Sequence, residues 1–191
     1  TLEGSKFADS NVVISSVLTH NVDVIIDFTL PAGVIEHLQY AKPMVIGTTG
    51  FTDDQLQQIK VAAASVPIVL SSNMSVGVNW CYKLLETTNQ ALDPSWTVHL
   101  KDVHHQHKKD QPSGTAKEIA RILSSRDVTI DSERRGEVVG DHTVTFANDF
   151  EEIVITHHAK DRSIFAKGAI AAARWVFDRA PQMYSMRDVV G

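Results

Sequence analysis

Three short, nearly continuous runs of apolar residues occupy the first third of the chain. They begin at Val22 (VDVIIDFT), Pro43 (PMVIGTT) and Pro67 (PIVLSS) and are rich in valine and isoleucine. Such runs are typical of strands buried on both faces of a parallel sheet. Helices are predicted between them, at about 32–40 and 52–64, and Thr52-Asp53-Asp54-Gln55 gives the second helix a cap signal. The order strand, helix, strand, helix, strand predicts a doubly wound α/β layer with right-handed crossovers.

The pattern changes in the second half of the chain. A long helix is predicted from Val78 to about Leu92, with Val78, Cys81, Leu84 and Leu85 on its buried stripe. The segment from Ser95 to Val103 alternates apolar and polar residues and predicts a half-buried strand. Further alternating strands are predicted at Val128–Ser132, His142–Ala147 and Glu152–His158, and a last helix at Ala166–Phe177. Alternation favours an antiparallel sheet with one wet or partner-covered face.

These patterns predict an α/β fold of two units. The first is a Rossmann-like parallel sheet that is incomplete at its N-terminus, and the second is an α+β unit built on a mixed or antiparallel sheet. The tail MYSMRDVVG has a role that composition does not reveal.

Small polar residues follow each of the three early strands. These tips are Thr29, Gly47-Thr48-Thr49-Gly50 and Ser71-Ser72-Asn73. Any one of them is explained by ordinary turn chemistry, but three at one edge of a parallel sheet favour a cofactor crevice. No G-x-G-x-x-G motif opens the chain, and Gly4 is the only glycine before Gly33. Either the first strand and its phosphate loop lie upstream of Thr1, or a dinucleotide is held in another way.

The densest chemistry lies between Val103 and Ala116, in the run VHHQHKKDQPSGTA. Thr115-Ala116-Lys117-Glu118 reads as a capping box, so a helix is predicted to start near Thr115. The amides of its first turn, the close approach that Gly114 permits, and the positive groups of Lys108, Lys109 and the histidines predict a site for a carboxylate or phosphate. The simpler alternative is a surface helix that Thr115 caps.

Composition narrows the class of protein. The chain has 191 residues, is 43% hydrophobic and carries a net charge of -5 with both signs interspersed, which is typical of a globular protein and argues against nucleic acid or an anionic membrane as partner. The single cysteine, Cys81, excludes a disulfide framework and indicates a reducing compartment. No apolar run reaches membrane-spanning length and no leader opens the chain, so a cytoplasmic location is predicted.

The run HHQHKKDQPSGTA resembles the signature of the dihydrodipicolinate reductase family, H-H-x-H-K-x-D-x-P-S-G-T-A. The stretches IDFT at Ile26, GTTG at Gly47, SNMSVGVN at Ser72, ITHHAKDRSIFAKGAI at Ile155 and MRDVV at Met186 agree as well. The resemblance covers the chain from about Val24. It implies hydride transfer from NADH or NADPH to C4 of a cyclic imine dicarboxylate in lysine and diaminopimelate biosynthesis.

The resemblance also implies roles for particular residues. His104 would be a proton donor and acceptor and Lys108 a proton donor, while His105, Gly114 and Thr115 would bind a substrate carboxylate. The nicotinamide side would be contacted by Gly47, Thr48, Thr49, Ser71, Ser72, Asn73 and Met74. Residues 1–75 and 166–191 would form the dinucleotide-binding domain, and 76–165 the substrate-binding and oligomerisation domain of a homotetramer. Residues His37 and His142 are interpreted as surface or structural histidines.

Two departures and two alternatives accompany this hypothesis. The chain shows no counterpart of the family's phosphate loop or ribose-reading residue, and the region 124–132 is shorter than is usual. One alternative is a zinc hydrolase using His104, His105 and His107, although neighbouring strand residues point apart and no carboxylate or cysteine nearby completes the set, so no metal is expected. The other alternative is a non-catalytic remnant that binds the dicarboxylate alone.

Overall fold

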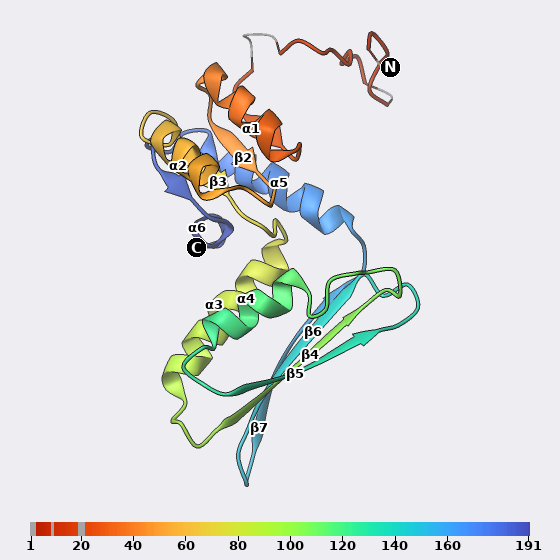
Figure 1. Ribbon diagram of the computed structural model, residues 1–191, viewed down its shortest axis with the longest axis vertical. Coiled ribbons are helices and arrows are strands. Elements are labelled where there is room, and N and C mark those ends of the chain that lie inside the picture. The colour runs from red at the N-terminus through yellow and green to blue at the C-terminus, as the bar shows by residue number, and fades with distance from the viewer. Residues whose placement is uncertain (1–2, 9, 19–21) are drawn as a thin grey trace.

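Two four-stranded sheets organise the chain (Figure 1). The computed structural model describes residues 3–8, 10–18 and 22–191. The first sheet has the order β1-β2-β3-β8 and all its pairs are parallel. Strands β1 (Ile25–Asp27), β2 (Met44–Ile46) and β3 (Ile68–Leu70) coincide with the three apolar runs, which confirms the predicted parallel layer.

Helices cover both faces of this parallel sheet, which explains why its strands are apolar throughout. Val45 and Val69 pack against α5 (Ser163–Val176) on one face. Met44, Ile46 and Ile68 pack on the other face with residues of α1 (Pro31–His37) and α2 (Asp53–Ala62). Alternate residues of β2 and β3 therefore enter two separate apolar clusters, and neither strand has an exposed side chain, whereas Ile26 of β1 is 43% exposed.

The ends of the early helices follow their local sequence. The predicted helix 32–40 is divided into α1 and the 3-10 turn η1 (Leu38–Tyr40), and the chain then leaves through Ala41 in a left-handed conformation. Thr52 caps α2 through the predicted capping box, in which its hydroxyl accepts from the Gln55 amide and the Gln55 side chain accepts from the Thr52 amide.

The second sheet is mixed, with the order β5-β4-β6-β7. Its strands are β4 (Thr97–His104), β5 (Val128–Arg134), β6 (Gly140–Ala147) and β7 (Glu152–Ala159). The pairs β4–β6 and β6–β7 are antiparallel, whereas β4 and β5 are parallel, so alternation misled the expectation of a wholly antiparallel sheet. The cause is the connection between β4 and β5, which runs through a helix and so crosses over instead of turning back.

Two helices, α3 (Val76–Ala91) and α4 (Gly114–Ile122), cover one face of the mixed sheet (Figure 1). The buried stripe of α3 is Val78, Tyr82 and Leu85, at i, i+4 and i+7. The predicted stripe was wrong in one member, because Leu84 is 48% exposed and lies on the other side of the helix. On β4, Val98 and Leu100 face the helices, while the intervening residues face outward.

The tail joins the parallel sheet, a role that its composition did not indicate. Strand β8 (Met183–Tyr184) pairs with β3, and α6 (Met186–Val190) follows after a capping box formed by Ser185 and Asp188. Arg187 of α6 pairs with Glu86 of α3 and with Glu118 of α4, 3.0 Å away. The tail therefore ties the parallel sheet to the helices of the second unit.

None of the helices in the described part of the chain combines the length and the apolar character that crossing a membrane requires.

Candidate active site

A cavity of about 640 Å³ lies where the carboxyl edge of the parallel sheet meets α4 and the end of β4. It is lined by residues of both units: Thr49, Ser72, Asn73, Tyr82, His104, His105, Lys108, Asp110, Ser113, Gly114, Thr115, Val139, Arg162 and Phe165. Eight of the predicted site residues line it, namely His104, Lys108, His105, Gly114, Thr115, Thr49, Ser72 and Asn73. The structure therefore brings both halves of the predicted site to one place.

The first turn of α4 forms one wall of the cavity. The predicted capping box at Thr115 was wrong, because the N-cap is Ser113, whose hydroxyl accepts from the Ala116 amide at 3.1 Å. Glu118 does not reach back to the turn and instead pairs with Arg121 and Arg187. The shift of the cap frees the Thr115 hydroxyl to face the cavity, and it places Gly114 and Thr115 at the positive end of the helix.

Asp110 places a carboxylate of the chain itself at this wall. Lys108 Nζ lies 2.7 Å from Asp110 Oδ1, and this hydrogen bond, assisted by the Gly114 amide, holds the pKa of the carboxyl below its ordinary value. One of the chain's own carboxylates thus occupies the point where an ammonium group and a helix N-terminus converge. A substrate carboxylate would find the same donors there.

A further cation reaches the cavity from the start of α5. The Nη2 atom of Arg162 lies 3.0 Å from His105 Nε2, and both residues line the cavity. Burial and the Arg162 charge lower the pKa of His105, which favours a neutral ring that accepts a hydrogen bond from the guanidinium. The sequence hypothesis did not include Arg162, because its arrival beside His105 depends on the path of the chain from β7 into α5.

The opposite wall consists of the tips of the parallel strands. Thr49 and Ser72 are exposed there, and Asn73 Nδ2 donates to Thr115 Oγ1 at 3.1 Å, which joins the two walls. Thr48 is buried, and its hydroxyl donates to the Thr29 carbonyl at 2.6 Å, so two of the predicted polar tips do converge.

Four residues predicted on the nicotinamide side do not line the cavity: Gly47, Thr48, Ser71 and Met74. Gly47 lies against the Phe28 ring, and Met74 is buried in the core beneath α5. Lys109, which the sequence added to the anion site, is exposed and does not line the cavity either. The predicted contacts of Gly47, Thr48, Ser71 and Met74 with a cofactor remain predictions.

Two more residues at the site were missed by the sequence hypothesis: Tyr82, which lines the cavity, and Asp102, which lies behind its wall. Asp102 lies two residues before His104 on β4 and is fully buried beside it, which the two-residue period of a strand could have indicated. Burial raises the pKa of Tyr82 to about 12, so this phenol stays protonated beside Thr115. Tyr82 was taken for neither core nor site, because an aromatic residue on an amphipathic helix gives no signal of its own.

The three histidines of the zinc alternative are not brought together. Within the described residues, the group of histidine, cysteine or acidic side chains close enough to share an ion is Asp102, His104 and His142, with ligand atoms within 4.8 Å of one another. Arg134 Nη1 lies 3.5 Å from the same carboxylate and adds a positive charge there. His105 and His107 belong to the loop beyond β4 and are not part of this group.

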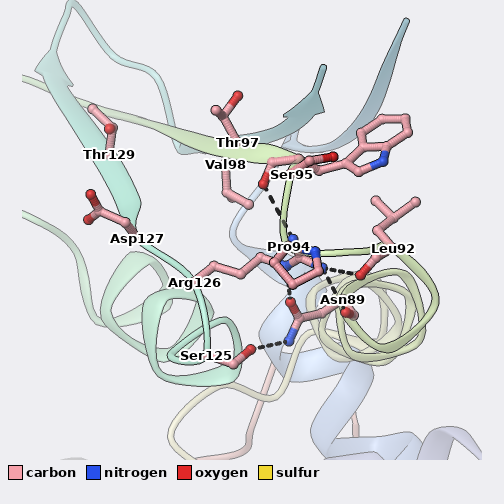
Figure 2. A pocket seen from close by; sticks show the side chains of 11 residues that line it. Asn89, Leu92, Pro94, Ser95, Thr97, Val98, Ser125, Arg126, Asp127 and Thr129 are labelled. Carbon is pink, nitrogen blue, oxygen red and sulfur yellow. Dashed lines mark hydrogen bonds between the residues drawn. The ribbon is translucent and has the colours of Figure 1, made fainter. Parts of the chain in front are cut away.

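A second cavity, of about 520 Å³, lies at the far end of α3, where Arg126 is its central cation (Figure 2). Its guanidinium donates to the carbonyls of Asn89, Leu92, Asp93 and Trp96 and to the Asn89 side chain. These bonds use the five donors of an arginine side chain, so none is left to hold a ligand. Arg126 instead satisfies the free carbonyls at the C-terminus of α3.

We expect Arg126→Ala to destabilise the protein by about 2 kcal/mol, because half-buried carbonyls lose charged donors. Thermal unfolding followed by circular dichroism should show a midpoint lowered by roughly 5 °C. Arg121→Ala is the matched control, since its side chain is 67% exposed and belongs to a surface pair worth at most about 1 kcal/mol. Equal shifts for the two variants would contradict the capping role.

Stability should fall on acidification in two stages. Burial lowers the pKa of His157, so the folded state resists a proton that the unfolded chain accepts below the ordinary value of 6.5. The buried Asp27 carboxylate is held below its ordinary pKa of 3.8 by hydrogen bonds from His37 and Thr29, which outweigh burial. A depressed pKa gives stability above the unfolded value, and this stability is lost as the pH falls. The unfolding midpoint should be flat above about pH 7, decline modestly to pH 5 and drop steeply below about pH 4. A midpoint that rises between pH 7 and 5 would contradict this prediction.

Comparisons with known proteins agree with this architecture. Two family models match, described as dihydrodipicolinate reductase, N-terminus, over residues 4–74, and dihydrodipicolinate reductase, C-terminus, over residues 77–190. A 4-hydroxy-tetrahydrodipicolinate reductase of Chromohalobacter salexigens is 42% identical over 88% of this chain and 73% of its own length. A protein of the same name from Methanoculleus marisnigri is 40% identical over 88% of this chain and 76% of its own length.

A solved structure shares the fold. It is the dipicolinate-bound dihydrodipicolinate reductase from Paenisporosarcina sp. TG-14, with a TM-score of 0.75 and 24% identity, over 85% of this chain and 71% of that one. The matched models span both sheets and the cavity between them, and the sequence identities are high over most of the chain. The chain therefore belongs to the dihydrodipicolinate reductase family.

Proposed function

We propose that this protein is a 4-hydroxy-tetrahydrodipicolinate reductase, which transfers a hydride from NADH or NADPH to a cyclic imine dicarboxylate and yields tetrahydrodipicolinate for lysine and diaminopimelate synthesis. The observation that carries the proposal is the composition of one cavity. A helix N-terminus and the cationic groups of Lys108 and Arg162 face the small polar tips of a parallel sheet across a space of about 640 Å³. That volume suits a small ring lying against a second flat ring.

The nicotinamide end of the cofactor fits the residues that are present. Thr49 and Ser72 leave the carboxyl edge of the sheet open, and an added Cβ on Gly50 of the same turn, at φ +85°, would meet no atom within 4 Å. Ligands of parallel α/β sheets bind at this edge. We place the nicotinamide contacts at Gly47, Thr48, Thr49, Ser71, Ser72, Asn73 and Met74, with those that do not line the cavity acting through the shape of their loops. When bound, the reduced nicotinamide supplies the hydride.

The chain's own residues then bind the dicarboxylate and supply the proton. One substrate carboxylate accepts from the amides of Gly114 and Thr115, where it takes the place of Asp110, and His105 and Arg162 hold it from the side. Addition of hydride at C4 pushes an electron pair toward the ring nitrogen, so negative charge grows on the ring. Lys108 stabilises this charge, and His104 donates the proton that completes the reduction. The hydride chemistry belongs to the cofactor, and the protein orients, polarises and protonates.

The division of labour between the units follows from this assignment. Residues 1–75 and 166–191 form the dinucleotide-binding domain, and residues 76–165 form the substrate-binding and oligomerisation domain. A cytoplasmic location accords with a biosynthetic reductase whose sequence has one cysteine.

We also place the protein in a homotetramer, in which the strands from Val128 to His158 meet their symmetry mates. Support comes from β7, which is an edge strand of the mixed sheet and exposes Ile153 at 38% and Val154 at 49%. Light scattering at several protein concentrations tests this, with Val154→Lys expected to shift the mass toward the monomer. A monomeric parent protein would refute the tetramer without touching the chemistry.

Two measurements test the proposed function. Isothermal titration calorimetry with pyridine-2,6-dicarboxylate and with NADH or NADPH should show binding of the dicarboxylate and of at least one nucleotide. Loss of NADH or NADPH absorbance should then depend on the cyclic imine. A protein that binds the dicarboxylate but neither nucleotide, and oxidises neither, would be the non-catalytic remnant, and the proposed function would be wrong.

A further inference from the structure

A row of buried and half-buried polar side chains runs across the mixed sheet. The strand register aligns Ser132, Asp102, His142 and His157 on β5, β4, β6 and β7. Residues that pair across neighbouring strands point to the same face, so the four side chains lie under α3 and α4. The fully buried Asp102 is the carboxylate of this row.

Asp102 contacts the anion-binding turn on one side. Its Oδ2 accepts from the Ser113 amide at 3.0 Å, and its Oδ1 accepts from the Ser113 hydroxyl at 2.7 Å. That hydroxyl is also the N-cap of α4, which accepts from the Ala116 amide. The carboxylate thus fixes the residue directly before Gly114 and Thr115, which line the cavity.

Asp102 contacts the proposed proton donor on its other side. The Nδ1 atom of His104 lies 3.0 Å from Asp102 Oδ1, and His142 Nε2 lies 3.3 Å from the same oxygen. Despite its short distance from Asp102 Oδ1, His104 Nδ1 makes no hydrogen bond with any described residue. The effect of Asp102 on the ring is therefore chiefly electrostatic. Burial opposes the charge on Asp102, but the contacts with His104, His142 and Ser113 hold its pKa well below the ordinary value.

Gly140, on the neighbouring strand β6, packs against the His104 ring. A Cβ built on Gly140 would lie 2.9 Å from His104 Nε2, so the ring packs directly against the glycine backbone. The backbone of Gly140 is not in the left-handed region, so only the ring opposes an alanine there, and an added Cβ would have to displace the ring. The ring is 8% exposed and is held between a carboxylate and a strand.

We propose that Asp102 is the positioning residue of this site, a single buried carboxylate that holds the His104 imidazole and the N-terminal turn of α4 in register with each other. This inference rests on the proposed function. It explains how His104 on β4 and the carboxylate-binding turn that begins at Ser113 keep one geometry, although an exposed loop separates them. Asp102 itself does not line the cavity.

The test compares Asp102→Asn with the parent protein, and Asp131→Asn serves as control because Asp131 is an exposed carboxylate on β5. Asp102→Asn keeps the shape and removes the charge. We expect kcat to fall about 100-fold and the Kd for pyridine-2,6-dicarboxylate to rise about 10-fold. The Asp131 variant should stay within about twofold in both.

A double-mutant cycle separates positioning from general damage. If Asp102 acts through His104, Asp102→Asn should lower kcat much less in a His104→Ala background than in the parent, because residues that act as a unit are non-additive. Multiplicative losses in the cycle would overturn the proposal. So would an Asp102→Asn protein with parental kcat and dicarboxylate affinity.

Two milder variants keep the test open if Asp102→Asn does not fold. Ser113→Ala cuts the link to α4 and should weaken dicarboxylate binding more than it lowers kcat. Gly140→Ala displaces the His104 ring and should lower kcat more than it weakens binding. If both variants changed kcat and dicarboxylate affinity in the same proportion, the proposal that Asp102 positions both His104 and the α4 turn would be wrong. Calorimetry with the dicarboxylate does not require turnover. If the parent protein had no reductase activity, the proposed function would be wrong, but the effect of Asp102→Asn on dicarboxylate affinity would still test the role of Asp102.

Discussion

Replacing either His104 or Lys108 with alanine should abolish most of the reductase activity. Loss of a positioned proton donor, as proposed for His104, or of the cation that stabilises the developing charge, as proposed for Lys108, costs about 10²- to 10⁴-fold in rate, and both side chains line the cavity. Initial rates of NADH or NADPH oxidation at saturating imine would measure kcat for each variant. His104→Ala should lower kcat with little change in KM, whereas Lys108→Ala should affect both, because the ammonium already holds the Asp110 carboxylate at 2.7 Å and would attract a substrate carboxylate in the same way.

Lys109→Ala is the matched control for this experiment. The same loop carries Lys109, which is exposed and outside the cavity, so its loss removes an equal charge without touching the site. We expect a change of less than about twofold. If Lys108→Ala and Lys109→Ala behaved alike, the effect of Lys108 would be one of general charge, and the assigned role would be wrong.

Gly168→Ala should unfold the protein or leave it strongly destabilised. A Cβ on Gly168 of α5 would lie 1.7 Å from the Met74 carbonyl oxygen, which is a backbone atom that cannot rotate away. Either the helix or the loop bearing Ser72 and Asn73 must shift by more than 1 Å. Overpacking of this kind costs about 3 kcal/mol, and the unfolding midpoint should fall by roughly 10 °C.

Ile170→Ala provides the comparison on the same helix. Ile170 is 47% exposed, so its truncation should change stability by less than about 1 kcal/mol. Surviving Gly168→Ala protein should also bind NADH or NADPH more weakly, because the displaced loop carries part of the sheet-edge wall. A Gly168→Ala protein as stable as the parent would show that α5 and this loop are not in direct contact.

The parallel sheet was predictable from sequence because burial on both faces leaves a direct signal. Val45 and Val69 face one helix layer while Met44 and Ile46 face the other, so the strands are apolar without interruption. The mixed sheet was only partly predictable. Alternation reports that one face is buried, but it does not report direction, and the parallel pairing of β4 with β5 is set by the intervening helix.

The site divides in the same way. One short stretch of the chain contains His104, Lys108, Gly114 and Thr115. Its many histidines and lysines indicate a functional site directly from the sequence. Arg162 and Tyr82 reach the cavity from distant segments, and neither residue type is unusual where it stands. The cap at Ser113 instead of Thr115 also depends on tertiary structure, because Asp102 holds the serine in place. Sequence patterns identify groups that are close along the chain, and packing determines which others join them.

The walls of the cavity come from positions as far apart as Thr49 and Phe165, and the strand that borders β3 arrives only at Met183. Contacts between segments this far apart in the sequence make folding slow. The chain loses the conformational entropy of large loops before the contacts that close them contribute stability. During synthesis the histidine run and the anion-binding turn are therefore made long before the guanidinium of Arg162 and helix α5 can dock beside them. A nascent chain would acquire its full affinity for the dicarboxylate only after α5 has been made, and the ligand itself would favour the docking of α5 by mass action.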